Sequence, residues 1–282
     1  ERCMKPGIRA LYVIHYFGFP QPILEAMEFA RRHGLVVIED CALSLFSAIP
    51  EGPLGSFGDI GIFCLYKTLP LPHGGTLALN RPGLEIPPRP EQPDRLSAFA
   101  YILNLLLDYV ALRLEGMGPK LASLGREMGR STKRAMKAAT VPIDTNELDT
   151  SVIPLGMGNA ARYILARTRP EEVVRIRREN YLYLKSLLVP EVRPLFPELP
   201  ECVCPLSLPI LVKEKERVHE ALYADGVGNV NFWRVWRKNV PAERFPEVDF
   251  LRRHVLEIPV HQGLARRHME FIAERVNERG RW

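Results

Sequence analysis

The N-terminal part of the chain alternates between short apolar runs and one amphipathic segment, which predicts strands interleaved with a helix. Residues 8–15 (IRALYVIH) form an apolar run of strand length that leads into an aromatic and glycine turn. Residues 22–33 then repeat apolar side chains at the spacing of one helical face, and Gly34 is expected to end that helix. This order of elements is typical of an α/β domain.

Residues 35–38 are continuously apolar, and two more apolar segments follow at residues 60–66 and 76–79. A run without polar alternation is expected of a central strand that is covered on both faces, so we predict a mainly parallel sheet. Open sheets of this kind bind their ligands outside the carboxyl ends of the strands. Asp40 and Lys67 both lie at such ends, which makes them the first candidates for a functional site.

The composition changes in the middle of the chain. Residues 87–93 (PPRPEQP) form a proline-rich linker, residues 98–112 are mostly apolar, and a basic stretch continues to Lys137. The apolar run is shorter than the roughly 20 residues that a membrane span needs, and it contains Asp108. We expect a buried helix followed by a solvated one; the alternative is an amphipathic hairpin that contacts a membrane surface.

The last part of the chain has the pattern of a small α+β domain. A long helical pattern over residues 159–188 is interrupted near Pro170. The segments after it are predicted as strands at 206–212, 227–232 and 255–260 and as helices at 215–224 and 265–277. We therefore divide the chain into a large-domain core (residues 1–87), a helical insert (88–150), and an interface helix with a small C-terminal domain (151–282).

Composition narrows the class of protein without identifying it. With 46% hydrophobic and 25% charged residues over 282 positions, the chain is ordinary globular material. A formal net charge of +5 is mild for this length, so we expect no nucleic-acid partner. The five cysteines have neither the spacing of a zinc site nor the even number of a disulfide framework, which favours a reducing, cytoplasmic setting.

Asp40 and Lys67 together suit the cofactor pyridoxal 5′-phosphate (PLP). PLP needs a lysine amine that forms a Schiff base with it and later moves a proton at the reacting carbon. It also needs a carboxylate that keeps its pyridine nitrogen protonated. Asp40 follows an apolar strand, where a buried carboxylate requires a cationic partner. Lys67 lies within the sequence FCLYKTL, where we expect apolar surroundings to favour the neutral, nucleophilic amine.

Four sequence blocks, taken in order, resemble the DegT/DnrJ-type sugar aminotransferases, a family of fold-type I PLP enzymes. The blocks are residues 13–18 (VIHYFG), 34–42 (GLVVIEDCA), 55–60 (GSFGDI), and Lys67 followed by Gly74-Gly75. The resemblance extends more weakly over the helix that starts near Asn159 and over residues 256–261. It implies the fold of these enzymes, with a PLP-binding large domain and a small C-terminal domain.

The resemblance implies a role for each matching residue. Lys67 carries the cofactor, Asp40 binds its ring nitrogen, and Ala42 lies beneath the ring. Cys64 stands nearest to the place of a serine that usually holds the cofactor phosphate. His15, at a strand end, is a candidate for a contact with the cofactor, and a structural hydrogen bond is the alternative.

The resemblance also implies partners and a reaction. Active sites in this family lie at a subunit interface, which implies a homodimer. Typical members transfer an amino group from an amino acid such as glutamate to a keto sugar, usually nucleotide-linked. The products serve polysaccharide or glycoconjugate biosynthesis.

The chain departs from the family pattern at several places. Leu43 replaces a usual glutamine, and Val152-Ile153-Pro154 replaces an Asn-x-Arg element. The family's N-terminal portion, with its phosphate-binding helix start, is missing before Glu1, so the chain looks truncated. Two alternatives therefore stay open: a catalytically degenerate or truncated protein that acts as a binding or assembly partner, and a PLP-dependent sugar dehydratase.

Overall fold

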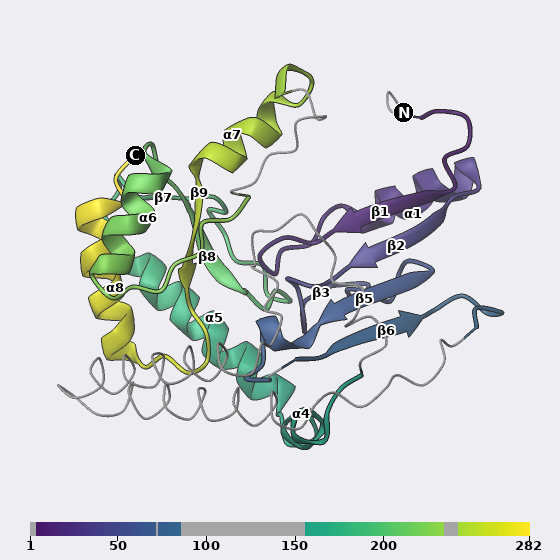
Figure 1. Cartoon of the computed structure of the whole chain (residues 1–282), viewed down its shortest axis with the longest axis horizontal. Coiled ribbons are helices and arrows are strands. Elements are labelled where there is room, and N and C mark those ends of the chain that lie inside the picture. Colours follow the sequence, from purple (N-terminus) through teal and green to yellow (C-terminus); the bar gives the residue numbers. More distant parts are fainter. Residues whose placement is uncertain (1–3, 72, 86–155, 234–241) are drawn as a thin grey trace, which may run out of the picture. The chain divides into compact units, whose positions relative to one another are not determined.

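The computed structural model describes residues 4–71, 73–85, 156–233 and 242–282 (Figure 1). The chain forms two compact units that are interleaved along the sequence. The first comprises residues 1–64, 76–84 and 169–282, and the second comprises residues 65–75 and 85–168. The predicted insert at 88–150 lies outside the described residues, and the predicted three-part division stays a prediction.

A four-stranded sheet with the order β1-β2-β5-β6 dominates the N-terminal part of the fold (Figure 1). Its strands are β1 (Ala10–Ile14), β2 (Val36–Asp40), β5 (Ile60–Cys64) and β6 (Gly75–Leu79). The first three are parallel, and Asp40 is paired with Ile14 on β1 and with Ile62 on β5. The carboxyl ends of β2 and β5 therefore meet at one edge of the sheet, as the sequence predicts.

β6 runs back along β5. Hydrogen bonds join Leu65 N to Gly74 O (3.0 Å) at one end and Asn80 N to Asp59 O (3.0 Å) at the other, which is the pattern of an antiparallel pair. One antiparallel edge strand on an otherwise parallel sheet is common in α/β folds. The predicted α/β class with a mainly parallel sheet is confirmed.

Helix α1 (Ile23–His33) covers one face of this sheet. Ile23 and Ala30 are buried against Val37, and Gly34 ends the helix in the left-handed conformation, as predicted. On the opposite face, Tyr12 is 51% exposed, while Ile14, Ile38 and Ile62 are partly exposed. The expectation that residues 35–38 are covered on both faces is therefore wrong, because burial in β2 alternates instead of being continuous.

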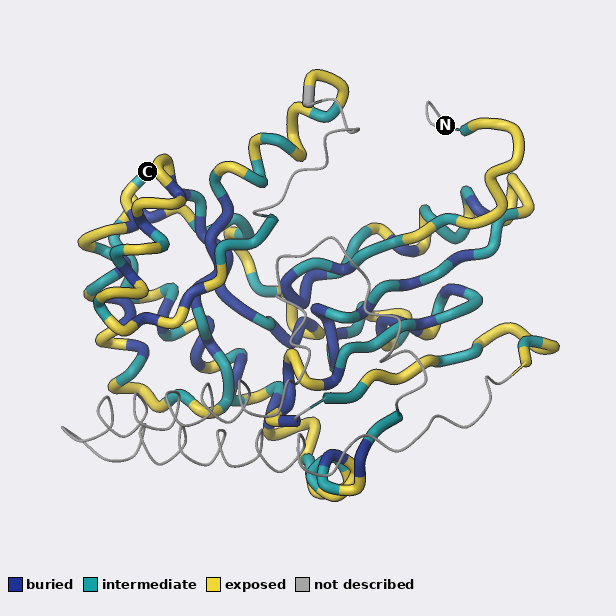
Figure 2. The backbone as a smooth tube through the Cα atoms, in the orientation of Figure 1, coloured by how far each residue is buried: buried dark blue, intermediate teal, exposed yellow. Residues whose placement is uncertain are grey.

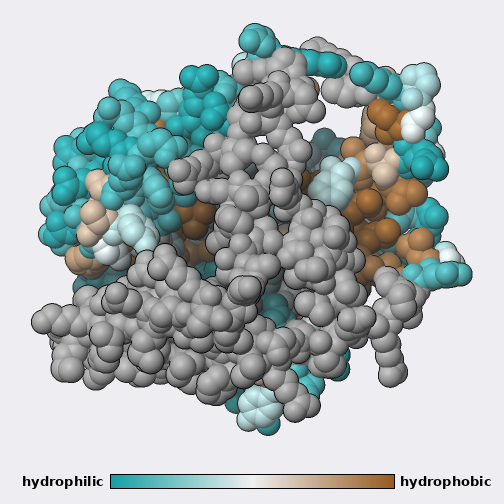
Figure 3. All heavy atoms as spheres, in the orientation of Figure 1, coloured by the Kyte–Doolittle hydropathy of each residue, from teal (hydrophilic) through white to brown (hydrophobic). Residues whose placement is uncertain are grey.

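Apolar residues, drawn in brown in Figure 3, are visible at the surface on the right, in the region of the four-stranded sheet. No helix among the residues that the structure describes is long and apolar enough to cross a membrane. The predicted helices of residues 98–137, and with them the membrane-surface alternative, lie outside the described ranges.

Two short elements follow β2, and one follows β5. β3 (Ala48–Ile49) and β4 (Gly52–Pro53) form a two-stranded antiparallel ladder. Residues Leu65–Lys67 form a 3₁₀ helix instead of extending β5, so the predicted strand 60–66 ends at Cys64. In the second unit, α4 (Asn159–Leu165) ends before Pro170, where a new helix begins as the sequence indicates.

The C-terminal part of the first unit is an antiparallel sheet with the order β7-β8-β9, packed against helices (Figure 1). The strands are β7 (Arg193–Pro194), β8 (Ser207–Leu211) and β9 (Val255–Pro259), and the helices are α5 (Pro170–Ser186), α6 (Lys215–Ala224), α7 (Pro246–His254) and α8 (Arg266–Arg279). Figure 2 shows β8 and β9 buried along most of their length. The predicted small α+β arrangement is present in these segments.

One expectation for this part is wrong, and one helix was not predicted. The predicted strand at residues 227–232 is an isolated bridge, in which Val230 and Glu257 exchange two hydrogen bonds of 3.1 Å. The side-chain amide of Asn229 binds the carbonyl oxygens of Val227 and His219, and this local bonding competes with a strand ladder. Helix α7 was not predicted: its sequence, PEVDFLRRH, is short and mostly polar, and none of its residues is buried.

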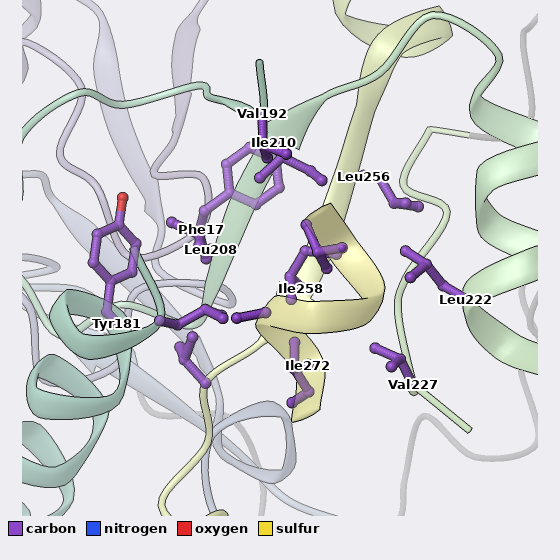
Figure 4. Close-up of a cluster of buried hydrophobic side chains, with 14 of the residues drawn as sticks. Phe17, Tyr181, Val192, Leu208, Ile210, Leu222, Val227, Leu256, Ile258 and Ile272 are labelled. Atoms are coloured by element: carbon purple, nitrogen blue, oxygen red, sulfur yellow. The ribbon is translucent and has the colours of Figure 1, made fainter. Parts of the chain in front are cut away.

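The largest hydrophobic core lies between this sheet and its helices (Figure 4). Tyr181 from α5, Leu208 and Ile210 from β8, and Ile258 from β9 are fully buried there. Phe17, which follows β1, joins the same core and is 1% exposed. The turn after β1 is therefore anchored in the C-terminal core.

Gly18, in the same turn, lies close to the backbone of Cys204 and Pro205. Its φ is +97°, and a Cβ atom would lie 2.3 Å from Cys204 O and 2.9 Å from the Cα of Pro205. We expect Gly18→Ala to lower the free energy of unfolding by about 3 kcal/mol, because backbone strain and overpacking add. Urea denaturation of the purified protein measures the change.

Gly226→Ala is the matched control. Gly226 also has a positive φ, +88°, but its added Cβ would meet no atom within 4 Å. The control should therefore lose only about 1 kcal/mol from conformational strain. Equal losses in the two variants would show that the contact with Cys204 does not matter.

Candidate active site

Asp40 is the last residue of β2 and holds its carboxylate on the face of the sheet that α1 does not cover. Oδ2 accepts a hydrogen bond from the Tyr12 hydroxyl (2.8 Å), and Oδ1 accepts one from the backbone N–H of Ala42 (2.9 Å). Among the described residues, no cation forms an ion pair with this carboxylate. A partly buried carboxylate with spare lone pairs and no such partner fits the protonated nitrogen of a pyridine ring.

Glu39, the neighbour of Asp40, points to the opposite face and is fully buried. Its Oε2 accepts a hydrogen bond from Gly55 N (2.8 Å), and its Oε1 accepts bonds from Phe57 N (2.7 Å) and Gly58 N (2.5 Å). Burial by itself raises the pKa of Glu39, but the hydrogen bonds from His15 and these N–H groups outweigh it and lower the pKa. Glu39 is therefore a buried anion that holds the turn before β5.

The turn requires glycine where it comes closest to the sheet. Gly55 has a φ of +86°, and a Cβ atom there would lie 2.3 Å from the ring of Phe63. This requirement explains part of the Gly-Ser-Phe-Gly-Asp block, which the sequence offers as a family signature. The block serves the Glu39 carboxylate, and through it the end of β2.

His15 is fully buried and uses both ring nitrogens within the protein. Nδ1 accepts a hydrogen bond from Gln21 N (3.0 Å), so Nε2 carries the proton and donates it to Glu39 Oε2 (3.3 Å). No ring nitrogen is left for a cofactor. Both hydrogen bonds give His15 a structural role, and its contact with the cofactor stays a prediction.

Cys41 brings a thiol close to the same pair, since ligand atoms of His15, Glu39 and Cys41 lie within 4.8 Å of one another. Metal binding would need the thiolate, but burial raises the pKa of Cys41 to about 12. The carboxylate of Glu39 is also occupied by four N–H donors. Hydrogen bonding within the protein accounts for this cluster.

Lys67 ends the 3₁₀ helix after β5 and belongs to the second unit, whereas Asp40 belongs to the first. Leu65, Thr68 and Leu69 are buried, but Tyr66 and Lys67 project into solvent. The apolar enclosure expected from the sequence FCLYKTL is therefore wrong for the amine itself, because the helical turn separates its apolar neighbours from it. The convergence of Lys67 with Asp40 stays a prediction.

The remaining predicted residues lie at the ends of β2 and β5. Ala42 contributes its backbone N–H to Asp40, and Cys64 is the last, partly buried residue of β5. Sequence reasoning missed Tyr12 and the role of Glu39. A signal for Tyr12 exists in the strand alternation, because residues 12 and 14 of β1 share the face of residues 38 and 40 in a parallel pair.

Comparison with known proteins finds a family match in the N-terminal part of the chain. Residues 1–85 match the DegT/DnrJ/EryC1/StrS aminotransferase family, which confirms the resemblance for this part of the chain. The UDP-N-acetyl-3-dehydro-alpha-D-glucosamine 3-aminotransferase of Acidithiobacillus ferrooxidans is 38% identical over 68 residues, which are 24% of this chain and 18% of that enzyme. The GDP-perosamine synthase of Escherichia coli O157:H7 is 34% identical over 74 residues, 26% of this chain and 20% of that enzyme.

Solved structures extend the likeness to the whole fold. PseC, a Helicobacter pylori aminotransferase involved in the biosynthesis of pseudoaminic acid, aligns with a TM-score of 0.63 at 14% identity. The alignment covers 99% of this chain and 68% of PseC. The fold is thus that of the sugar aminotransferases, while the sequence match spans about a fifth of the length of the curated relatives.

Proposed function

We propose that this protein is a PLP-dependent aminotransferase that moves an amino group from an amino acid such as glutamate to a nucleotide-linked keto sugar. The observation that carries the proposal is the Asp40 carboxylate at the carboxyl end of β2, without a cationic partner among the described residues. Two relatives are named for reactions of UDP- and GDP-linked sugars, which supports the substrate class.

Each residue of the site has a defined task under this proposal. PLP supplies an electron-withdrawing ring that stabilises negative charge at the substrate's reacting carbon. Asp40 would hold the ring nitrogen and keep it protonated. The Ala42 N–H orients the Asp40 carboxylate, and the Ala42 side chain would contact the ring. Lys67 would hold the cofactor through Nζ and would serve as the group that moves a proton at the substrate's reacting carbon. Cys64 lies on the strand that leads to Lys67 and takes the place of a phosphate-binding serine.

The assembly and setting follow from the same proposal. We place the enzyme in the cytoplasm as a homodimer, since the amino donor and nucleotide-linked sugars are cytoplasmic metabolites and the site is expected at a subunit interface. Size-exclusion chromatography with light scattering measures the mass in solution. A monomer at all concentrations would reject the dimer without rejecting the PLP site.

Covalent labelling tests the function directly. The purified protein is incubated with PLP, reduced with borohydride, digested, and analysed by mass spectrometry. We expect the phosphopyridoxyl group on Lys67, and we expect Lys213→Ala, which removes another exposed lysine, to label normally. Label on other lysines with none on Lys67 would overturn the assignment.

A second readout separates catalysis from binding. Glutamate added to the PLP-loaded protein should bleach the visible absorbance and release 2-oxoglutarate in proportion to the protein. Labelled protein that releases no 2-oxoglutarate with any amino donor would favour a non-catalytic role. Water loss from the sugar without a net gain of nitrogen would favour a dehydratase.

A further inference from the structure

Tyr12 and Asp40 are joined across two neighbouring strands. Tyr12 pairs with Ile38, and Ile14 pairs with Asp40, so Tyr12 is a diagonal neighbour of Asp40 on the same face of the sheet. An aromatic side chain is long enough to span this diagonal. The Tyr12 hydroxyl lies 2.8 Å from Asp40 Oδ2, a normal length for a hydrogen bond to a carboxylate.

The hydroxyl of Tyr12 is not explained by packing. The residue is 51% exposed, so a phenylalanine would make similar apolar contacts. The pKa of Tyr12 is raised to about 12, first by burial of the phenol and then by the hydrogen bond and the negative charge of Asp40, with a smaller effect of Tyr16. The hydroxyl therefore stays protonated at physiological pH and acts as a permanent donor.

The two donors to Asp40 leave room for a third group. Oδ2 binds Tyr12 and Oδ1 binds Ala42 N–H, and each carboxylate oxygen has two lone pairs. A ring nitrogen can therefore bind the carboxylate while both protein donors stay in place. With its two oxygens held by different groups, the carboxylate keeps one orientation.

We propose that Tyr12 is a positioning residue that holds the Asp40 carboxylate oriented toward its heterocyclic partner. The contact itself stands independently of any cofactor, whereas the identity of the partner rests on the proposed function. One experiment below tests the contact between Tyr12 and Asp40, and a second tests the identity of the partner.

The first experiment uses the cofactor-free protein with ¹³Cζ-labelled tyrosine. Tyr12, assigned by its loss in Tyr12→Phe, should ionise near pH 12 in the native protein and nearer its ordinary value of 10.0 in Asp40→Asn. Tyr181 is the control, because its pKa is raised by burial alone and should not respond to Asp40. If alkali unfolds the protein first, the Tyr12 resonance at pH 7 should still differ between the two proteins. An identical Tyr12 signal in both would reject the contact.

The second experiment measures PLP affinity by titration of its absorbance. Tyr12→Phe should bind PLP about tenfold more weakly, as expected for the loss of one hydrogen bond to a charged group. Tyr223→Phe, at a residue that is 68% exposed on α6, should bind normally. Equal affinity of Tyr12→Phe and native protein would overturn the positioning role but leave the proposed function intact. Failure of the native protein to bind PLP would reject the proposed function, while the tyrosine signals would still decide the contact.

Discussion

Lys67→Ala is expected to release 2-oxoglutarate from glutamate about 10²- to 10⁴-fold more slowly than the native protein, which is the usual contribution of a positioned general base. The loss should not come from unfolding. Lys67 is exposed, and exposed substitutions usually change the free energy of unfolding by less than about 0.5 kcal/mol. Rates measured with PLP-saturated protein, together with urea denaturation, check both parts of this expectation.

Chemical rescue makes the assignment specific to the amine. A small primary amine such as ethylamine, added to Lys67→Ala, should recover part of the lost rate, because it can replace the missing group as a proton carrier. Lys213→Ala should keep the native rate and show no response to the amine. A Lys67→Ala protein with native turnover would remove Lys67 from the reaction.

Glu39→Ala is expected to lower the free energy of unfolding by about 3–5 kcal/mol, the largest effect on stability that the site offers. The substitution removes the acceptor for three backbone N–H groups and for His15 Nε2 in a place that water does not reach. The free energy of unfolding of a domain is only about 5–15 kcal/mol, so the variant should be marginally stable. Urea denaturation at neutral pH measures the loss.

Glu39→Gln tests whether the negative charge matters, with the exposed Glu51→Gln as control. The pKa of Glu39 is lowered in the folded protein, so its stabilising effect is complete above the ordinary value of 4.5 and is lost as the pH falls through the lower folded value. The stability difference between native protein and Glu39→Gln should therefore shrink in acid below that value. A difference that stays constant with pH would mean that the shape of the side chain, and not its charge, supports the turn.

The sequence predicts the elements that follow strong periodic or steric signals. Gly34 ends α1 because it adopts the left-handed conformation, and Pro170 starts α5 because proline suits the first helical turn. Asp40 was found because a carboxylate after an apolar strand is unusual. These signals are local, so a single chain carries them.

The features that the sequence did not predict depend on side-chain hydrogen bonds, burial and strand register, which the apolar pattern does not show. Val230 forms a bridge instead of a strand because Asn229 bonds to nearby carbonyl oxygens, and α7 has no buried side chain to mark it. Lys67 is exposed although its neighbours are apolar, since a 3₁₀ turn directs them differently. The Tyr12 contact becomes visible only when the register of β1 and β2 is known.

Glu39 and Asp40 are neighbours on β2, so the strand register that buries Glu39 also sets the orientation of Asp40. Successive side chains of a strand point to opposite faces, so a shift of β2 by one residue would exchange the two acids. Asp40 would then face the interior with a side chain too short to reach the turn at Gly55, and Glu39 would face solvent. A one-residue insertion between Gly34 and Val37 should therefore prevent folding. Every folded molecule then has Asp40 on the face that α1 does not cover, before any ligand binds.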